Sequence, residues 1–323
     1  MDIRCTQNIF RSACGTVSIS YYILRPMNVP LRAIIQISHG CNEYFLRYTQ
    51  FAKYLCSLGF VVCGHDHIGH GESVRTSGSY GFFGQKDGYH VMVEDIHTLN
   101  QIVHERWPEL PCFLFGHSMG AMLVRLYLAK YGDTVDGCIL SGLPAQNAMA
   151  PIGVRIAKSV VRSRGPMYRS VLLDRMVFGR YNDHIQNCRT KFDWLTRDEN
   201  VVALYQSDAK CNFILTAAGF RDLFQINQLC SGFRIVRETP AEIPILFVAG
   251  DADPVGDFGT GVKRIAAAYK TAGFSDIDMI LYKDCRHEVL NELGHEQVYG
   301  DISKWLDQHL HSVGCANVQA AQA

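Results

Sequence analysis

The chain has 323 residues, 48% of them hydrophobic and 19% charged, with a formal net charge of +0. This length and composition suit a globular protein with one large domain, or a domain with an insertion. A neutral chain has no long-range field to attract nucleic acid, and residues 1–30 hold no basic start followed by a long apolar run. We therefore expect no nucleic-acid partner, and a cytoplasmic location by default.

Short apolar runs alternate with amphipathic runs through the first 143 residues. Residues 1–30 resemble antiparallel edge structure, with a strand over 17–24. Buried strands are predicted at 33–37, 60–63, 112–115 and 137–143, and helices at 45–58, 89–107 and 121–131. This alternation predicts an α/β fold, with a mostly parallel, doubly wound sheet and helices on both faces.

The alternation stops at Pro144 and resumes near Ile243. Residues 144–239 show helical segments and no clear strand, so we expect a helical cap inserted over the carboxyl edge of the sheet, where ligands bind. Residues 1–143 and 240–313 form the expected core, and 314–323 an expected disordered tail. The second half should hold strands at 243–249 and 277–282, and helices at 261–271 and 296–310.

The sequence contains no strong metal or disulfide pattern. Its 12 cysteines include no C-x-x-C pair, so we expect reduced thiols. His65, His67 and His70 crowd one loop, but the glycines there make a turn after a strand and favour a structural role. We expect neither a metal nor another cofactor.

A G-x-S-x-G motif follows the predicted strand at 112–115 and precedes a predicted helix. It reads Gly116-His117-Ser118-Met119-Gly120. A serine in this context occupies a tight, strained turn that exposes its hydroxyl, and side chains at the two glycines would clash with neighbouring elements. Ser118 is therefore the expected nucleophile of a hydrolase.

A nucleophilic serine needs a base, and the base needs an orienting group. The last two predicted strands run into loops that contain Asp251, Asp253 and Asp257, and then His287. This order, nucleophile then acid then histidine, favours His287 as the base. Asp253 is the preferred acid because its loop can reach the neighbouring strand, and Asp251 is the alternative.

The oxyanion formed in acyl transfer needs preorganised donors. The amide after the nucleophile, that of Met119, is one candidate. The second should come from the loop after strand 33–37, which begins His39-Gly40, and the amide of Cys41 is the natural donor.

These segments together resemble the monoglyceride lipase and lysophospholipase branch of the α/β-hydrolase family, with bacterial members the most similar. The resemblance implies a serine hydrolase with Ser118, Asp253 and His287 as its triad, the Cys41 and Met119 amides as its oxyanion hole, and a cap that encloses an acyl-chain tunnel. The chain departs from the pattern at Tyr44, where histidine is usual, and at Ala121, where glycine is common. The matching segments are His39-Gly40 with Glu43 and Arg47-Tyr48, DHIGHGES at 66–73, GHSMG at 116–120, GDADPV at 250–255, and Arg286-His287-Glu288.

The early part of the expected cap is basic and amphipathic. Such a segment can dock on an anionic lipid surface, although a cap helix with a solvated outer face explains the same pattern. Over this span only Asp174 opposes the basic residues, which are Arg155, Lys158, Arg162, Arg164, Arg169, Arg175 and Arg180.

The leading functional hypothesis is hydrolysis of single-chain acyl esters, with monoacylglycerol as the first substrate. A lysophospholipid and a short-chain or aryl ester are the alternatives, and a peptidase remains open. Dehalogenases and epoxide hydrolases of this fold use an aspartate nucleophile, whereas position 118 is serine. The alternative from another class is a ligand-binding protein on a hydrolase scaffold. Acyl-chain length, head group and oligomeric state stay open.

Overall fold

The computed structural model describes residues 2–320, with side chains through Leu310. Within these residues eight strands form one sheet, in the order β1-β2-β4-β3-β5-β6-β7-β8. The strands from β3 to β8 pair in parallel, whereas β2 is antiparallel to both β1 and β4. Their bounds are β1 Ile3–Arg11, β2 Ser18–Pro26, β3 Ala33–Ser38, β4 Phe60–His65, β5 Cys112–His117, β6 Gly137–Ser141, β7 Ile245–Gly250 and β8 Ile277–Tyr282.

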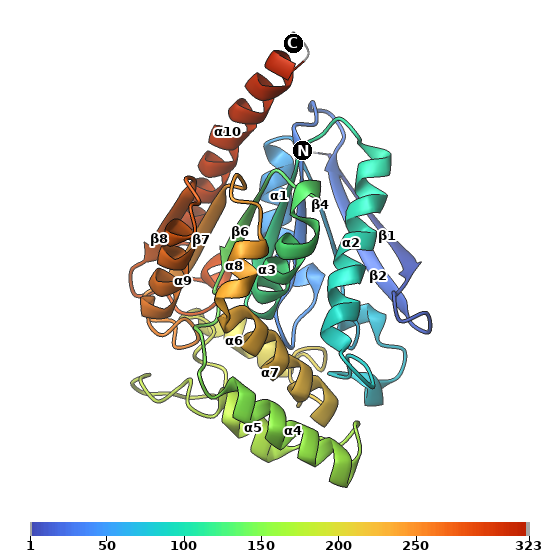
Figure 1. Cartoon of the computed structure of the whole chain (residues 1–323), viewed down its shortest axis with the longest axis vertical. Helices are drawn as coiled ribbons and strands as arrows, with labels where there is room; N and C mark the ends of the chain where they lie inside the picture. Colours follow the sequence, from blue (N-terminus) through green and yellow to red (C-terminus); the bar gives the residue numbers. More distant parts are fainter. Residues whose placement is uncertain (1, 321–323) are drawn as a thin grey trace.

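Helices cover both faces of the sheet (Figure 1). Neighbouring residues of one strand enter different cores: Ile34 packs in the cluster under α2, α3 and α9, and Ile35 in the cluster under α1 and α10. This alternation explains why the central strands are apolar throughout, and it confirms the predicted fold class. The helices are α1 Thr49–Ser57, α2 Gly88–Arg106, α3 Met119–Tyr131, α9 Thr260–Thr271 and α10 His295–Ala320.

A helical segment separates β6 from β7. In Figure 1, α4 and α5 lie at the end of the molecule farthest from the C-terminus, and α7 lies between them and the sheet. Phe220 of α7 and Ile235 of α8 share the buried cluster of α3, so this part of the insertion packs on the core. The helices are α4 Ala150–Arg164, α5 Val171–Phe178, α6 Glu199–Ser207, α7 Ala217–Ser231 and α8 Phe233–Glu238.

Several predicted elements differ from the observed ones, and the strand expected over 137–143 ends at Ser141. The helix expected over 45–58 is a 3-10 turn, Phe45–Tyr48, followed by α1, and the amide of Phe45, which has no helical carbonyl before it, is bound by Asp66. The strand expected from Ile243 begins at Ile245, because Pro244 has no amide to donate to the sheet.

The C-terminal helix is also longer than expected. It continues past Leu310 to Ala320, through most of the expected disordered tail. No proline follows Leu310, so nothing in the backbone chemistry interrupts the hydrogen-bonding pattern. Residues 321–323 of that tail lie outside the described residues. Within residues 2–320, no helix combines the length and apolar character needed to cross a bilayer.

Candidate active site

Ser118 occupies the turn between β5 and α3, at the carboxyl edge of the sheet. Its φ of +53° and ψ of −116° lie in a strained region that side-chain-bearing residues rarely adopt. The flanking glycines allow this turn. A Cβ at Gly120 would lie 2.0 Å from the carbonyl oxygen of Ser38, and one at Gly116 would lie 2.7 Å from the Cα of Ala121. The two glycines therefore let the nucleophile turn pack closely against the end of β3 and the start of α3.

His287 and Asp253 come together from the loops after the neighbouring strands β8 and β7. The His287 Nδ1 lies 2.9 Å from the Asp253 Oδ2, and both residues are buried. The other oxygen of Asp253 accepts the amide of Val255 at 2.9 Å, which fixes the carboxylate. Burial by itself would lower the pKa of His287, but the charge and hydrogen bond of Asp253 outweigh it, and the pKa is raised. The pair is thus arranged to stabilise an imidazolium.

Asp251, the alternative acid, is engaged elsewhere. Its Oδ1 accepts the backbone amide of Asp284 at 2.6 Å, so the side chain connects the loops after β7 and β8. The structure describes no contact between Asp251 and His287.

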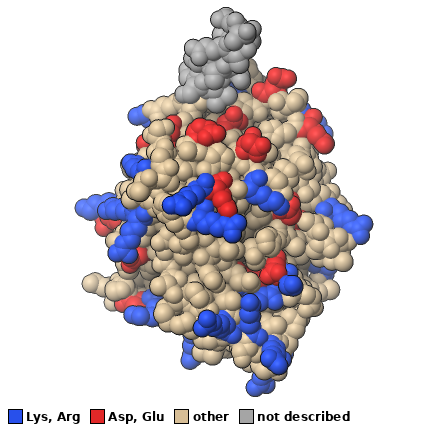
Figure 2. Space-filling view, viewed as in Figure 1, with Lys and Arg blue, Asp and Glu red and all other residues tan. Residues whose placement is uncertain are grey.

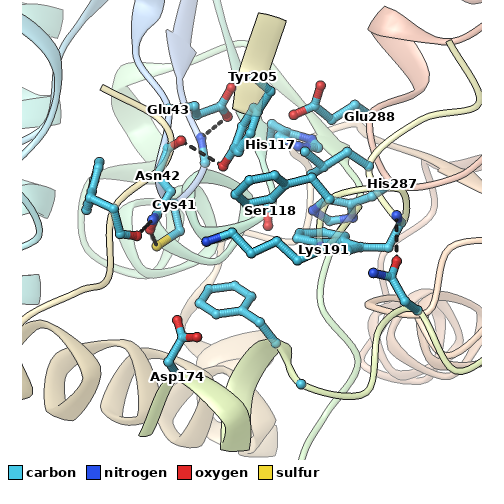
Figure 3. A pocket seen from close by; sticks show the side chains of 18 residues that line it. Cys41, Asn42, Glu43, His117, Ser118, Asp174, Lys191, Tyr205, His287 and Glu288 are labelled. Carbon is cyan, nitrogen blue, oxygen red and sulfur yellow. Dashed lines mark hydrogen bonds between the residues drawn. The ribbon is translucent and has the colours of Figure 1, made fainter. Parts of the chain in front are cut away.

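Two cavities meet at Ser118. The first, of about 180 Å³, is lined by aromatic and charged side chains and by His287 (Figure 3). The second, of about 240 Å³, is mostly apolar, and both cavities are bordered by Ser118, Cys41, Phe178 and Trp194. The polar side chains of the first include Asn42, Glu43, Asp174, Asn182, Lys191 and Glu288. The apolar side chains of the second include Met119, Met122, Met176, Val177, Leu223, Phe224 and Val255.

The loop after β3 lies against the nucleophile turn. A Cβ at Gly40 would lie 3.2 Å from the Cβ of Ser118, so only a small residue fits this approach. In the described part of the chain, the amides of Cys41 and Met119 donate no hydrogen bond to another protein group. Two free donors therefore lie beside Ser118.

A buried ionic cluster beside this cavity was not predicted from the sequence. Arg47 pairs with Glu43 at 2.9 Å and with Glu288 at 2.7 Å. Burial would raise the pKa of Glu288, but the charge and hydrogen bonds of Arg47 hold it at about 2. Burial is the main cause of a raised pKa at Glu43. The spacing of Glu43 and Arg47 is a visible signal in the sequence, whereas nothing in it connects them to Glu288.

In the histidine-rich segment at the end of β4, both ring nitrogens of His67 are bound within the protein. His67 Nε2 lies 3.0 Å from Ser38 Oγ, and His67 Nδ1 lies 3.1 Å from His65 Nε2. Among the described residues, the one group spaced to hold a metal ion is Asp276, Asp278 and His309. It lies at the amino end of β8, at the opposite edge of the sheet from Ser118, and His309 already pairs with Asp276 at 3.1 Å.

The comparison with known proteins agrees with this geometry. Residues 29–294 match the family described as "Serine aminopeptidase, S33". A monoacylglycerol lipase of Mycolicibacterium smegmatis is 30% identical over 303 residues, covering 92% of this chain and 95% of that protein. Human monoglyceride lipase is 26% identical, and the match covers 91% of this chain and 88% of that protein. A solved carboxyl esterase from Bacillus coagulans, in complex with glycerol, has a TM-score of 0.89 and 30% identity. The match covers 95% of this chain and 99% of that chain. The chain therefore belongs to this family of α/β-hydrolases, and it is a hydrolase.

Proposed function

We propose that this hydrolase is a serine esterase that cleaves monoacylglycerol to a fatty acid and glycerol. The observation that carries the proposal is the position of Ser118 between two cavities, one that adds charged side chains to its aromatic lining and one that is lined mainly by apolar side chains. A single-chain ester has the same division, because its acyl chain is apolar and its alcohol carries hydroxyl groups. The ester carbonyl would lie at the junction, beside the serine.

The proposed reaction proceeds through an acyl-enzyme. The Ser118 Oγ attacks the ester carbonyl, and His287 takes the hydroxyl proton at Nε2 while Asp253 binds its Nδ1–H. The amides of Cys41 and Met119 stabilise the oxyanion. His287 then gives the proton to the departing glycerol oxygen. Water repeats these steps on the acyl-enzyme and releases the fatty acid.

The insertion between β6 and β7 supplies much of both cavities, which supports its assignment as a cap over residues 144–239. Asp174 and Lys191 from this insertion face the first cavity (Figure 3), and together they offer an acceptor and a donor to a polyol. The solved carboxyl esterase relative was crystallised with glycerol, the alcohol that this reaction releases. A lysophospholipid is the second candidate, because Lys191 could also bind its phosphate.

The outer face of the cap supports a peripheral contact with lipid. Exposed apolar side chains accompany the basic ones there, and Lys and Arg gather at the end of the molecule that holds α4 and α5 (Figure 2). This combination suits an anionic membrane surface, where the substrate is found. The exposed apolar residues are Met149, Ile152, Met167, Tyr168, Val171 and Leu172.

The test compares fatty-acid release from a long-chain monoacylglycerol and from the matching lysophosphatidylcholine, with Ser118→Ala as the control. We expect faster release from the monoacylglycerol and none in the variant. Faster release from the lysophospholipid would move the assignment to that class. Labelling of Ser118 by a fluorophosphonate without cleavage of either lipid would keep the serine hydrolase and refute the substrate. Co-sedimentation with anionic vesicles, weakened by salt, checks the membrane contact.

A further inference from the structure

An ionic bridge joins the two loops that carry the groups expected in catalysis. Glu43 lies two residues after Cys41, and Glu288 directly follows His287. Arg47 binds both carboxylates. Its Nη1 lies 2.9 Å from Glu43 Oε2 and 2.7 Å from Glu288 Oε1, and its Nη2 lies 2.7 Å from Glu288 Oε2. The contact with Glu288 is bidentate, the geometry that fixes a carboxylate most firmly.

Each carboxylate also accepts hydrogen bonds from nearby residues of its own segment. The Oε1 of Glu43 accepts the amide of Gly40, the residue before Cys41, and the hydroxyl of Tyr48 at 2.7 Å. The Oε2 of Glu288 accepts the side-chain amide of Asn291 at 2.9 Å. A displacement of either carboxylate would therefore move the backbone beside Ser118 or beside the base.

The bridge is shielded from water. The exposed fraction of the side chain is 12% for Arg47 and 4% for each glutamate. Tyr205 of the cap helix α6 packs over Arg47, with the guanidinium carbon 4.8 Å from the centre of its ring, and its hydroxyl donates to the carbonyl of Asn42 at 2.8 Å. Buried charges with good geometry hold their partners rigidly, because no water can replace either one.

We propose that Arg47 is a positioning residue, which acts through Glu43 and Glu288 to hold the Cys41 amide and the His287 imidazole in the arrangement that attack by Ser118 requires. This inference rests on the proposed function. Catalysis depends on placement within fractions of an ångström, and an error of 1 Å costs about 10²-fold in rate. Arg47 itself lines neither cavity, so the effect of its loss should fall on turnover more than on substrate binding.

The test measures kcat and KM of Arg47→Gln and Arg47→Lys on an ester that the wild type cleaves. We expect Arg47→Gln to lower kcat about 10²-fold while KM stays within about threefold. Arg47→Lys keeps the charge without the bidentate contact, so its kcat should lie between those of the wild type and Arg47→Gln. Arg32→Gln is the matched control, because it breaks the half-exposed pair with Asp307 at 2.8 Å, away from both cavities, and should leave kcat unchanged.

A pH profile separates this role from general stability. The charged and titratable groups around His287 are Asp253, Glu288, Glu43 and His117, and those around Arg47 also include Tyr48, Tyr205 and Cys211. Glu288→Gln removes a negative charge that raises the pKa of His287, so the acidic limb of kcat/KM should move to lower pH. A purely structural glutamate would leave that limb in place.

The outcomes are distinguishable from failure of the proposed function. A wild type that does not take a fluorophosphonate at Ser118 refutes the serine mechanism. If the wild type takes the fluorophosphonate at Ser118 and a folded Arg47→Gln variant keeps kcat within about twofold, only the positioning role is refuted. If Arg47→Gln does not fold, the kcat of Arg47→Lys and the pH limb of Glu288→Gln decide, and wild-type values for both overturn the inference.

Discussion

The His287 imidazole is bound through Nδ1 by the Asp253 carboxylate at 2.9 Å, with both side chains buried. The contact leaves Nε2 as the nitrogen available to take a proton, and it fixes the plane of the ring. Asp251 is only two residues away in the chain and has no such contact, since it binds the amide of Asp284. The two aspartates therefore make a matched pair for mutation.

Substitution of Asp253 by Asn should lower kcat by about 10³–10⁴-fold, because the amide cannot hold the required tautomer. The pKa of His287 should fall with the lost charge, and the acidic limb of kcat/KM should move to lower pH. Asp251→Asn should keep kcat within about twofold. Steady-state kinetics between pH 5 and 9 check both variants, and the reverse ranking would assign the acid to Asp251.

Substitution of Gly120 by Ala should destabilise the fold as well as abolish activity. The added Cβ would lie 2.0 Å from the Ser38 carbonyl oxygen and 2.5 Å from that of His39, so the β3 end and the nucleophile turn must separate. We expect a loss of about 2–3 kcal/mol in the free energy of unfolding, measured by denaturant titration. Gly300→Ala, a helical position with nothing within 4 Å of the added Cβ, is the control and should be neutral or stabilising.

Gly153 of α4 lies against the ring of Phe224, which lines the second, mostly apolar cavity. A Cβ at position 153 would lie 2.6 Å from the Phe224 Cδ1, so Gly153→Ala should push the ring toward the space proposed for the acyl chain. The ratio of kcat/KM for long-chain over medium-chain monoacylglycerol should fall about tenfold, and Phe224→Ala should raise it. An unchanged ratio in both variants would mean that the acyl chain lies elsewhere. Gly78→Ala adds a methyl group in open space and serves as the control.

Acid should destabilise the histidine-rich loop after β4. Burial lowers the pKa of His65 to about 3 and of His70 to about 4, and that of His67 falls as well. Between about pH 4 and 6.5 the unfolded chain binds protons at these positions and the native chain does not, so stability falls as the pH falls through this window. Three buried aspartates oppose this loss of stability. Burial raises the pKa of Asp66, Asp95 and Asp222 to about 6, so their protonation favours the native state as the pH falls.

The His70→Phe variant isolates one of these contributions. His70 is fully buried against Phe83, and its Nε2 has no hydrogen-bond partner in the described chain. The loss of stability between pH 7 and pH 5 should shrink by about 1–2 kcal/mol relative to the wild type. Denaturant titrations at the two pH values measure this difference. An equal loss in both proteins would contradict the assignment of a neutral, buried His70.

The sequence was sufficient for the fold class and for the place of Ser118 in the turn between a strand and a helix. Apolar strands with glycine-rich loops at their carboxyl ends predict a parallel sheet, and G-x-S-x-G between a strand and a helix places Ser118 at its edge. These are local signals, because the backbone conformation of a turn or a strand depends on neighbouring residues. The boundaries were less accurate where a proline interrupted the backbone pattern, as at Pro244.

The sequence favoured Asp253 over Asp251 by its place in the loop, and the tertiary structure adds that the Asp253 side chain contacts His287 whereas that of Asp251 binds the amide of Asp284. Only the tertiary structure shows that Arg47 binds Glu288, which lies 241 residues away, and that the insertion brings Trp194 and Tyr205 to the cavities. Contacts of this range depend on how the sheet orders its strands. Pairing across such a distance leaves no periodic trace in the sequence, because no local backbone pattern encodes it.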